Sequence, residues 1–326
     1  MNKMKSLTVR QITEAVNGDL LHGNPEDVIC GISTDSREVL KGEAFFPLIG
    51  EQYDAHDFIP QAADRGCSLV VLSKMPEKQL LQRSDVSFLL VENTTEALQK
   101  LAKYYLSLLS IKKIGVTGST GKTTTKEMLY RIFSEKYKTS RNPGNFNNHI
   151  GLPLTVLSIP EDTEVGIFEM GMSELGEVDL LAELIHPDIG IITNIGNSHI
   201  ESLGSRESIL KAKLEIVNYF DQDNILIINE ESDLLSKDTV KGNYKVITIG
   251  ETGKSNFILS NINDFGEDGI EFTIEYEKVM QTFRLLVPGR HNAYNAALAI
   301  AAGISCGISR EEAAAGLLKL EITDKR

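Results

Sequence analysis

Short apolar runs alternate with stretches of helical spacing along the second two thirds of the chain. The runs occupy 114–117, 166–168, 189–193, 224–228 and 246–249. Continuous apolar runs are typical of strands buried on both faces, and strands that alternate with helices predict a largely parallel sheet. Because ligands of such sheets bind at the carboxyl ends of the strands, the residues after each run are the first candidates for chemistry.

The pattern changes within residues 257–287. Apolar Ile270, Phe272, Ile274 and Tyr276 alternate with polar residues, and this period of two is typical of a half-exposed antiparallel strand. We therefore expect an antiparallel β-meander attached to the parallel sheet. Two predicted helices follow it, at 292–302 and 309–320.

The first part of the chain mixes short apolar strands with turns and predicts a small α/β domain over residues 1–92. Apolar positions at helical spacing then predict a helix from Asn93 to Ser110, which would connect this domain to the next. The expected fold class is therefore α/β, with a small N-terminal domain and a central parallel-sheet domain. The central domain would span 93–320 and carry the meander, and 321–326 would begin a linker.

Composition narrows the class of protein. The chain has 326 residues, of which 41% are hydrophobic and 24% are charged, as expected of a soluble globular protein with two or three domains. A net charge of −13 disfavours nonspecific binding to nucleic acid or to anionic membranes. The N-terminus lacks an apolar signal segment and no run reaches membrane-spanning length, so we expect a cytoplasmic protein. Cys30, Cys67 and Cys306 lie too far apart in sequence to suggest a disulfide framework or a zinc site.

A glycine-rich turn separates the first apolar run of the central domain from a predicted helix. Its residues are Gly118, Ser119, Thr120, Gly121, Lys122, Thr123 and Thr124. In such a turn, backbone N–H groups close on phosphate oxygens, the lysine adds a positive charge and the next threonine offers a hydroxyl to Mg²⁺. The usual pattern G-x-x-x-x-G-K-[ST] would have a glycine where Val116 stands. A chance glycine-rich turn is the alternative to a phosphate-binding loop.

Two further polar residues follow strands at the same predicted edge of the sheet. Glu169 comes directly after 166–168, where its carboxylate would suit a Mg²⁺ ion; a helix cap or a surface charge is the ordinary alternative. His199 follows 189–193 after a short loop and is either a second metal ligand or a surface histidine.

Lys213 falls in the apolar stripe of a helix predicted over 205–219. Lys211, in contrast, aligns with Glu207 and Glu215 on a solvated face. A lysine among apolar neighbours either extends its ammonium to water or is buried with a lowered pKa and a nucleophilic amine. Helical spacing alone leaves both interpretations open.

Asparagines gather at two places. Those around Pro143 and Gly144 are typical of a turn, and they are Asn142, Asn145, Asn147 and Asn148. Asn292 and Asn295 share one helix face, where two amides either bind a purine edge or cap the start of the helix.

Taken together, these segments resemble the Mur ligase superfamily, whose members use ATP to form amide bonds in peptidoglycan synthesis. The resemblance covers nearly the whole chain, and its most specific segments are 117–123, 145–148, 168–173, 193–199 and 289–295. The family's phosphate loop places its glycines as this chain does, which accounts for Val116. The segments 147–153 and 168–173 look most like those of members that add D-Ala-D-Ala to UDP-MurNAc-tripeptide.

The resemblance implies a role for each matched position. It implies catalytic roles for Lys122, Glu169, His199 and Lys213. It implies ATP contacts for Gly118, Ser119, Thr120, Gly121, Lys122, Thr123, Thr124, Asn148, Asn292 and Asn295. It implies two Mg²⁺ ions with the ligands Thr123, Glu169, His199 and Lys213, the last of them carbamylated. It implies that the first domain binds the UDP-sugar at Ser33, Asp35, Ser36 and Arg37, and at 50–57, where Ala55 replaces the family's usual glycine.

The implied partners are ATP, UDP-MurNAc-tripeptide and D-Ala-D-Ala, and we expect a monomer. The implied reaction passes through an acyl phosphate. Family members carry a third domain after the central one, and this sequence ends where that domain would begin, so we expect these 326 residues to ligate weakly or not at all. A nonenzymatic module that binds the UDP precursor is the alternative, and an unrelated P-loop kinase is a more remote one.

Overall fold

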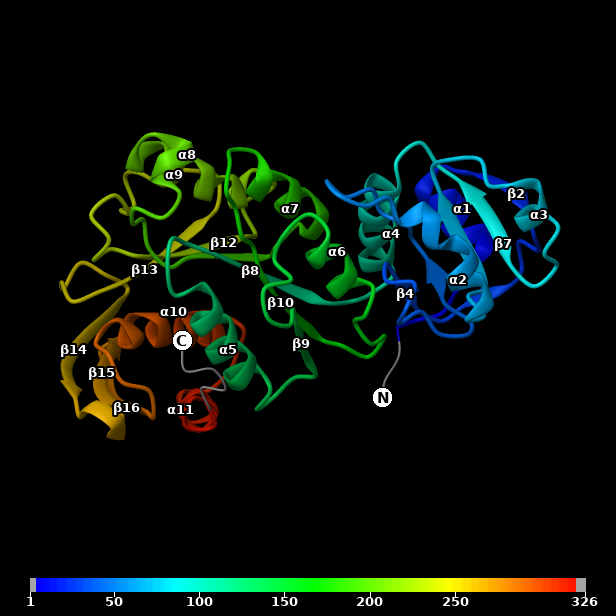
Figure 1. Cartoon of the computed structure of the whole chain (residues 1–326). Helices are drawn as coiled ribbons and strands as arrows, with labels where there is room; N and C mark the ends of the chain where they lie inside the picture. Colours follow the sequence, from blue (N-terminus) through cyan, green and yellow to red (C-terminus); the bar gives the residue numbers. More distant parts are fainter. Residues whose placement is uncertain (1–3, 321–326) are drawn as a thin grey trace. The chain divides into compact units, whose positions relative to one another are not determined.

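The computed structural model describes residues 4–320, which form two compact units (Figure 1). Unit 1 comprises residues 4–110 and 149–162, and unit 2 comprises 111–148 and 163–320. The expected α/β fold class is confirmed in both. Residues 321–326, expected to begin a linker, lie outside the described residues.

Unit 1 is built on a five-stranded sheet with the order β2-β7-β6-β5-β4. Its strands are β2 (Asp19–His22), β4 (Ile32–Ser33), β5 (Ala44–Phe45), β6 (Leu69–Leu72) and β7 (Ser87–Leu90). The strands pair in parallel except at β2, which runs antiparallel to β7. The short apolar strands expected in this part of the chain are present, although β5 has only two residues. Two short strands, β1 (Leu7–Thr8) and β3 (Val28–Ile29), pair separately.

The helices of unit 1 include the one expected to begin the central domain. They are α1 (Val9–Val16), the 3₁₀ helix η1 (Ala55–Phe58), α2 (Ile59–Asp64), α3 (Lys78–Leu81), α4 (Thr94–Ser107) and α6 (Gly151–Val156). Helix α4 packs against α1 and α6, and the buried Tyr105 hydroxyl donates to the Ile159 carbonyl at 2.6 Å. Because these contacts tie α4 to unit 1, the two units divide after Ser110 rather than after residue 92.

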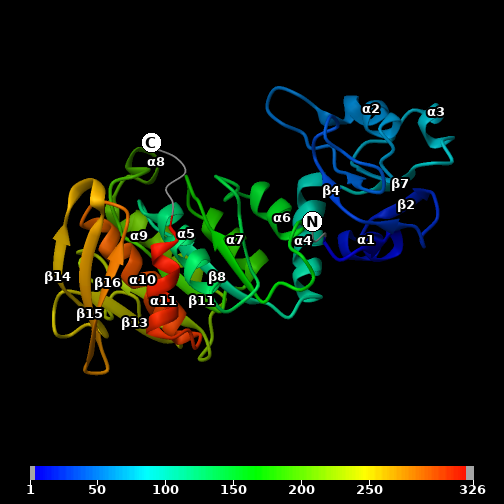
Figure 2. The same cartoon turned by 90° about the horizontal axis from the view of Figure 1, so that it is seen from below.

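Unit 2 contains a nine-stranded sheet with the order β16-β15-β14-β13-β12-β11-β8-β10-β9. Its parallel strands are β8 (Lys112–Thr117), β9 (Thr139–Arg141), β10 (Val165–Glu169), β11 (Ile189–Ile192), β12 (Ile225–Asn229) and β13 (Lys245–Gly250). All five strands expected from apolar runs are therefore present. β14 (Phe257–Asp264) pairs in parallel with β13 and antiparallel with β15 (Ile270–Tyr276), which pairs antiparallel with β16 (Val279–Leu285). This confirms the predicted meander, which extends one end of the sheet (Figure 2).

Helices cover both faces of this sheet. One side carries α5 (Lys122–Phe133), α10 (His291–Ser305) and α11 (Arg310–Leu318) (Figure 1). The other side carries α7 (Glu177–Ile185), α8 (Ile200–Leu203), α9 (Arg206–Leu214) and the 3₁₀ helix η2 (Glu215–Val217). A last 3₁₀ helix, η3 (Gly266–Asp268), connects β14 to β15. On β8, Ile114 and Val116 face the core shared with α5 and α10. Gly115 faces the other way, where a Cβ would lie 3.1 Å from Ile216 Cδ1, so η2 packs directly on the strand.

None of the described helices combines the length and the apolar character needed to cross a membrane.

Candidate nucleotide site

The glycine-rich turn joins β8 to α5 and needs its glycines where the chain has them. Gly118 has φ +149° and Gly121, the residue before α5, has φ +81°. A Cβ at Gly118 would lie 1.9 Å from Thr193 Oγ1, and one at Gly121 would lie 2.6 Å from Asn295 Oδ1. Val116 is still within β8 and fully buried, so it belongs to the core rather than to the turn.

The segment after β11 braces this turn. The Thr120 N–H donates to Asn194 Oδ1 at 3.0 Å, and Asn194 Nδ2 donates to Thr120 Oγ1 at 2.7 Å. The Gly196 N–H donates to Ser119 Oγ at 2.8 Å. Sequence reasoning singled out only His199 from this segment. The bracing by Asn194 was not foreseen, because it depends on β11 pairing directly with β8.

A cavity of about 290 Å³ opens beside the turn. It is lined by Thr120, Gly121, Thr124, Thr193, Asn194, Asn229, His291, Tyr294 and Asn295. The two asparagines of α10 differ in their placement, since Asn292 is not part of this lining. Asn292 Nδ2 donates to the Pro288 carbonyl at 2.7 Å, and its Oδ1 accepts from Asn295 Nδ2 at 3.1 Å. Asn292 therefore orients Asn295, and Asn229, His291 and Tyr294 are lining residues that sequence reasoning missed.

Two lysines lie near each other at this end of the sheet. Lys122 Nζ donates to the Gly118 carbonyl at 2.8 Å, and burial lowers the pKa of Lys122 against the opposing effect of the Glu169 carboxylate. Lys213 is only 1% exposed. Burial, together with the positive charge of Lys122, lowers the pKa of Lys213 to about 7. Of the two interpretations of Lys213, the structure therefore favours the buried amine.

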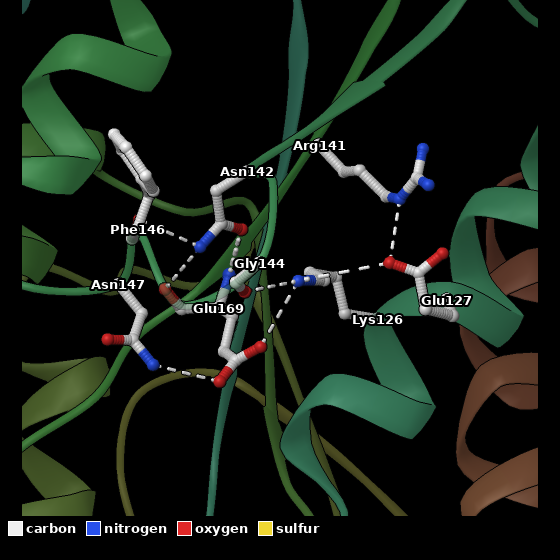
Figure 3. A network of polar contacts seen from close by, with 8 residues as sticks. All are labelled: Lys126, Glu127, Arg141, Asn142, Gly144, Phe146, Asn147 and Glu169. Atoms are coloured by element: carbon white, nitrogen blue, oxygen red, sulfur yellow. Dashed lines mark hydrogen bonds and ion pairs between the residues drawn. The ribbon is translucent and has the colours of Figure 1, made fainter. Parts of the chain in front are cut away.

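Glu169 ends β10 beside β8 and is almost fully buried. Its Oε1 accepts from Asn147 Nδ2 at 2.9 Å, and its Oε2 lies 3.3 Å from Lys126 Nζ (Figure 3). Asn142 binds the main chain of Glu169 on both sides: its Oδ1 accepts from the N–H at 2.8 Å, and its Nδ2 donates to the carbonyl at 3.2 Å. The asparagine-rich segment is therefore more than a turn, because it holds this carboxylate in place.

Glu169 is the residue that best fits a cation. Its Oε2 is buried and, apart from the ion pair with Lys126, has no hydrogen-bond partner among the described residues. Such an oxygen is the type of ligand that Mg²⁺ prefers. Within the described part of the chain, no group of three or more His, Cys, Asp or Glu side chains converges to hold a metal.

Three expected site residues lie at the surface. Thr123 and Asn148 are exposed, on α5 and in the loop after β9. His199 is also exposed and has φ +66°, a left-handed conformation, at the start of α8. The structure does not bring His199 into contact with Glu169, so its role as a ligand stays a prediction.

The expected UDP-sugar residues form a turn in unit 1 after β4. Ser33 Oγ donates to the Asp35 carbonyl at 3.1 Å, and Ser36 Oγ donates to Gln61 Oε1 at 2.7 Å. Arg37 Nη2 donates to Asp35 Oδ2 at 2.6 Å. The hydrogen bonds from Arg37 lower the pKa of Asp35 to about 2. Arg37 is largely exposed, so its guanidinium remains accessible to an anionic ligand.

Comparison with known sequences identifies the family. Residues 116–303 match the family described as Mur ligase middle domain, and residues 28–106 match Mur ligase family, catalytic domain. The UDP-N-acetylmuramoyl-tripeptide–D-alanyl-D-alanine ligase of Bacillus subtilis (strain 168) is 43% identical over 324 residues, which cover 98% of this chain and 68% of that protein. The ligase of the same name from Escherichia coli (strain K12) is 32% identical over 325 residues, which cover 99% of this chain and 70% of that protein.

Solved structures agree with this assignment. A crystal structure of MurF from Acinetobacter baumannii superposes with a TM-score of 0.90 at 29% identity, covering 98% of this chain and 70% of that one. MurF ligase from Thermotoga maritima, solved in complex with ADP, superposes with a TM-score of 0.80 at 27% identity, covering 90% and 66%. Family matches, sequence identity and fold agree, and the chain therefore belongs to the Mur ligase family of ATP-dependent ligases.

Proposed function

We propose that this chain takes part in ATP-dependent amide bond formation that joins D-Ala-D-Ala to UDP-MurNAc-tripeptide. The observation that carries the proposal is the convergence of the phosphate loop, the buried Glu169 carboxylate and the buried Lys213 amine at one end of the unit 2 sheet. The names of the B. subtilis and E. coli relatives, and the ADP complex of the T. maritima relative, support the choice of substrates.

The proposed reaction has two steps. The terminal carboxylate of the tripeptide attacks the γ-phosphorus of ATP, which forms an acyl phosphate and breaks the bond to ADP. The amine of D-Ala-D-Ala then attacks the acyl carbon, and phosphate leaves as the amine loses a proton. Both steps need charge stabilisation and positioning more than a protein nucleophile.

The residues of unit 2 have distinct proposed roles. Main-chain N–H groups of the loop and the Lys122 ammonium bind the phosphates, and the cavity that includes Asn295 takes the rest of the nucleotide. Thr123, Glu169, His199 and Lys213 are the proposed Mg²⁺ ligands, Lys213 after carbamylation by CO₂. When bound, Mg²⁺ offsets negative charge on the transferred phosphoryl group. A neutral Lys213 amine suits carbamylation because only the deprotonated form is nucleophilic.

Unit 1 is the proposed site of the UDP precursor. Its candidate residues Ser33, Asp35, Ser36 and Arg37 lie in one turn, in which the exposed Arg37 offers a cation to a diphosphate. The internal hydrogen bonds of this turn fix its main chain before the ligand arrives.

A phosphate-release assay tests the function. With ATP, Mg²⁺, UDP-MurNAc-tripeptide and D-Ala-D-Ala, we expect product formation that Lys122→Ala reduces at least about a hundredfold, since it removes a charge from the transferred phosphoryl group. Lys211→Ala, on the exposed face of α9, is the matched control and should retain the wild-type rate.

The same assay separates the alternatives. Product formation that depends on both the UDP precursor and D-Ala-D-Ala would support the ligase. Tight binding of the UDP precursor without nucleotide binding would support the nonenzymatic module instead. Phosphorylation of an acceptor without any dependence on the UDP precursor would indicate an unrelated kinase.

A further inference from the structure

Lys126 is a fully buried lysine to which the proposed reaction gives no role, and it lies at the centre of a polar network that includes Glu169 (Figure 3). It lies on α5, one turn after Lys122 of the phosphate loop. An unpaired ammonium in the interior would cost several kcal/mol, so the groups around Lys126 indicate what it is for.

The Lys126 ammonium bridges three segments of unit 2. Its Nζ donates to the Gly144 carbonyl at 3.2 Å and lies 3.3 Å from Glu169 Oε2. Glu127 Oε1 is 3.9 Å away and also accepts from Arg141 Nε at 2.8 Å. Two positive and two negative side chains therefore balance one another between the phosphate-loop helix, the end of β10 and the asparagine-rich loop.

Hydrogen bonds hold the main chain and one carboxylate oxygen of Glu169, but not its other oxygen, Oε2. Asn142 fixes its main chain and Asn147 donates to Oε1. Lys126 draws Oε2 by charge, yet that oxygen has no hydrogen-bond partner among the residues described. The carboxylate is thus held in one orientation while a lone pair on Oε2 stays available to a cation.

We propose that Lys126 is a positioning residue, which orients Glu169 so that Oε2 can accept the Mg²⁺ that accompanies the bound nucleotide. This inference rests on the proposed function. Fixing a ligand before binding removes the entropy cost of ordering it, and partners of metal ligands typically change metal affinity by 10- to 100-fold. An ammonium also repels a cation, but Glu127 lies close enough to offset part of that charge.

The test compares ADP affinity with Mg²⁺ and with EDTA by calorimetry. The ratio of the two dissociation constants isolates the metal contribution. In Lys126→Met we expect this ratio to fall about tenfold or more, with the affinity in EDTA little changed. Lys126→Arg, which retains the charge, should recover part of the loss. Lys211→Met, which changes an exposed lysine on α9 in the same way, should match the wild type.

Each outcome separates a positioning role from a structural one. A Lys126 that only stabilises the fold would lower both affinities equally, and an unchanged ratio in folded Lys126→Met would overturn the proposal. A higher ratio would mean that repulsion of Mg²⁺ dominates, which also overturns it. If Lys126→Met does not fold, Lys126→Gln decides the question, since its amide can still donate to the Gly144 carbonyl. A wild-type chain without any Mg²⁺ effect on ADP binding would contradict the proposed function itself.

Discussion

Two lysines of unit 2 are buried in different surroundings. Lys126 faces the carboxylates of Glu169 and Glu127, whereas Lys213 is exposed to the positive charge of the Lys122 ammonium. Burial and like charge both disfavour the protonated form, so the pKa of Lys213 falls to about 7. One lysine is therefore suited to hold a carboxylate, and the other is suited to react as an amine.

The lowered pKa of Lys213 makes stability depend on pH. Its ordinary pKa is 10.5. Above about pH 7 the folded chain has lost this proton while the unfolded chain keeps it, so unfolding takes up a proton and stability rises with pH. Below about pH 7 both states carry the proton and this contribution is constant.

We predict that Lys213→Met removes this contribution. Urea unfolding in CO₂-free buffer between pH 6.5 and 8.5 should show the wild-type free energy of unfolding rising by up to about 1.4 kcal/mol per pH unit from this group. The Met variant should lack that rise, and Lys211→Met should keep it. An equal rise in Lys213→Met would assign the pH dependence to other groups.

Asn142 holds the main chain around Glu169 through its side-chain amide. It is fully buried, and its amide satisfies the N–H and carbonyl of Glu169 together with the Phe146 carbonyl. Asn142→Ala removes these three hydrogen bonds, and each buried group left unsatisfied costs about 1–3 kcal/mol.

We therefore expect Asn142→Ala to lower the free energy of unfolding by roughly 2–5 kcal/mol, measured by urea titration. The exposed Asn145→Ala, in the same loop, is the control and should change it by less than about 0.5 kcal/mol. Equal effects of the two substitutions would contradict this role of Asn142.

At the scale of elements, contacts between helices decide details that the sequence pattern misses. Spacing on α9 predicted a surface pair between Lys211 and Glu215. In the structure Glu215 instead accepts from the Gly176 N–H at 2.8 Å and the Asp179 N–H at 3.1 Å, at the start of α7. Negative charge at a helix N-terminus is favourable, and this contact anchors the end of the helix that carries Lys213.

Helix α11 packs closely on α5 through Gly316. A Cβ there would lie 2.7 Å from Ile132 Cα and 2.8 Å from the Arg131 carbonyl oxygen, both of them main-chain atoms that cannot move aside alone. Because α5 also carries Lys122 and Lys126, the packing of α11 on α5 helps to hold these two lysines in place.

We predict that Gly316→Ala destabilises unit 2 by about 1–3 kcal/mol through overpacking, despite the better helix propensity of alanine. The control is Gly253→Ala, where a Cβ meets nothing within 4 Å and should change stability by less than about 1 kcal/mol. Denaturant unfolding of both variants measures the difference. Equal stability of the two would mean that α11 shifts at little cost.

Continuous apolar runs predicted five of the six parallel strands of unit 2, because burial on both faces requires apolar residues at successive positions. They missed the short polar strand β9. Helical spacing did not predict that α4 belongs to unit 1, since a helix with one apolar stripe does not reveal which partner covers it. The phosphate loop could be predicted because its signature lies within one continuous segment. The roles of Asn194 and Lys126 could not be predicted in this way. Their partners lie on other strands and become visible only once the strand order is known.

At the scale of the whole molecule, the two units have separate sheets and separate cores. No strand pairing joins them among the described residues, and the core of unit 1 around Phe45 and Phe88 shares no residue with that of unit 2. A ligand stabilises the structure that binds it, by about 2.7 kcal/mol at a concentration of 100 Kd. The nucleotide should therefore stabilise unit 2 alone if the units unfold independently.

Hydrogen exchange with Mg²⁺ and ADP tests this independence. At 100 Kd, amides of β8, β11 and α5 that exchange through global unfolding should slow about a hundredfold, because 2.7 kcal/mol corresponds to that factor in the opening equilibrium. Amides of β6 and β7 should exchange as before. Because exchange reports each amide separately, slowing of β6 and β7 by the same factor would show instead that the units open in one cooperative step. The UDP precursor should give the converse pattern, with β6 and β7 protected and β8 unchanged, if its site lies in unit 1.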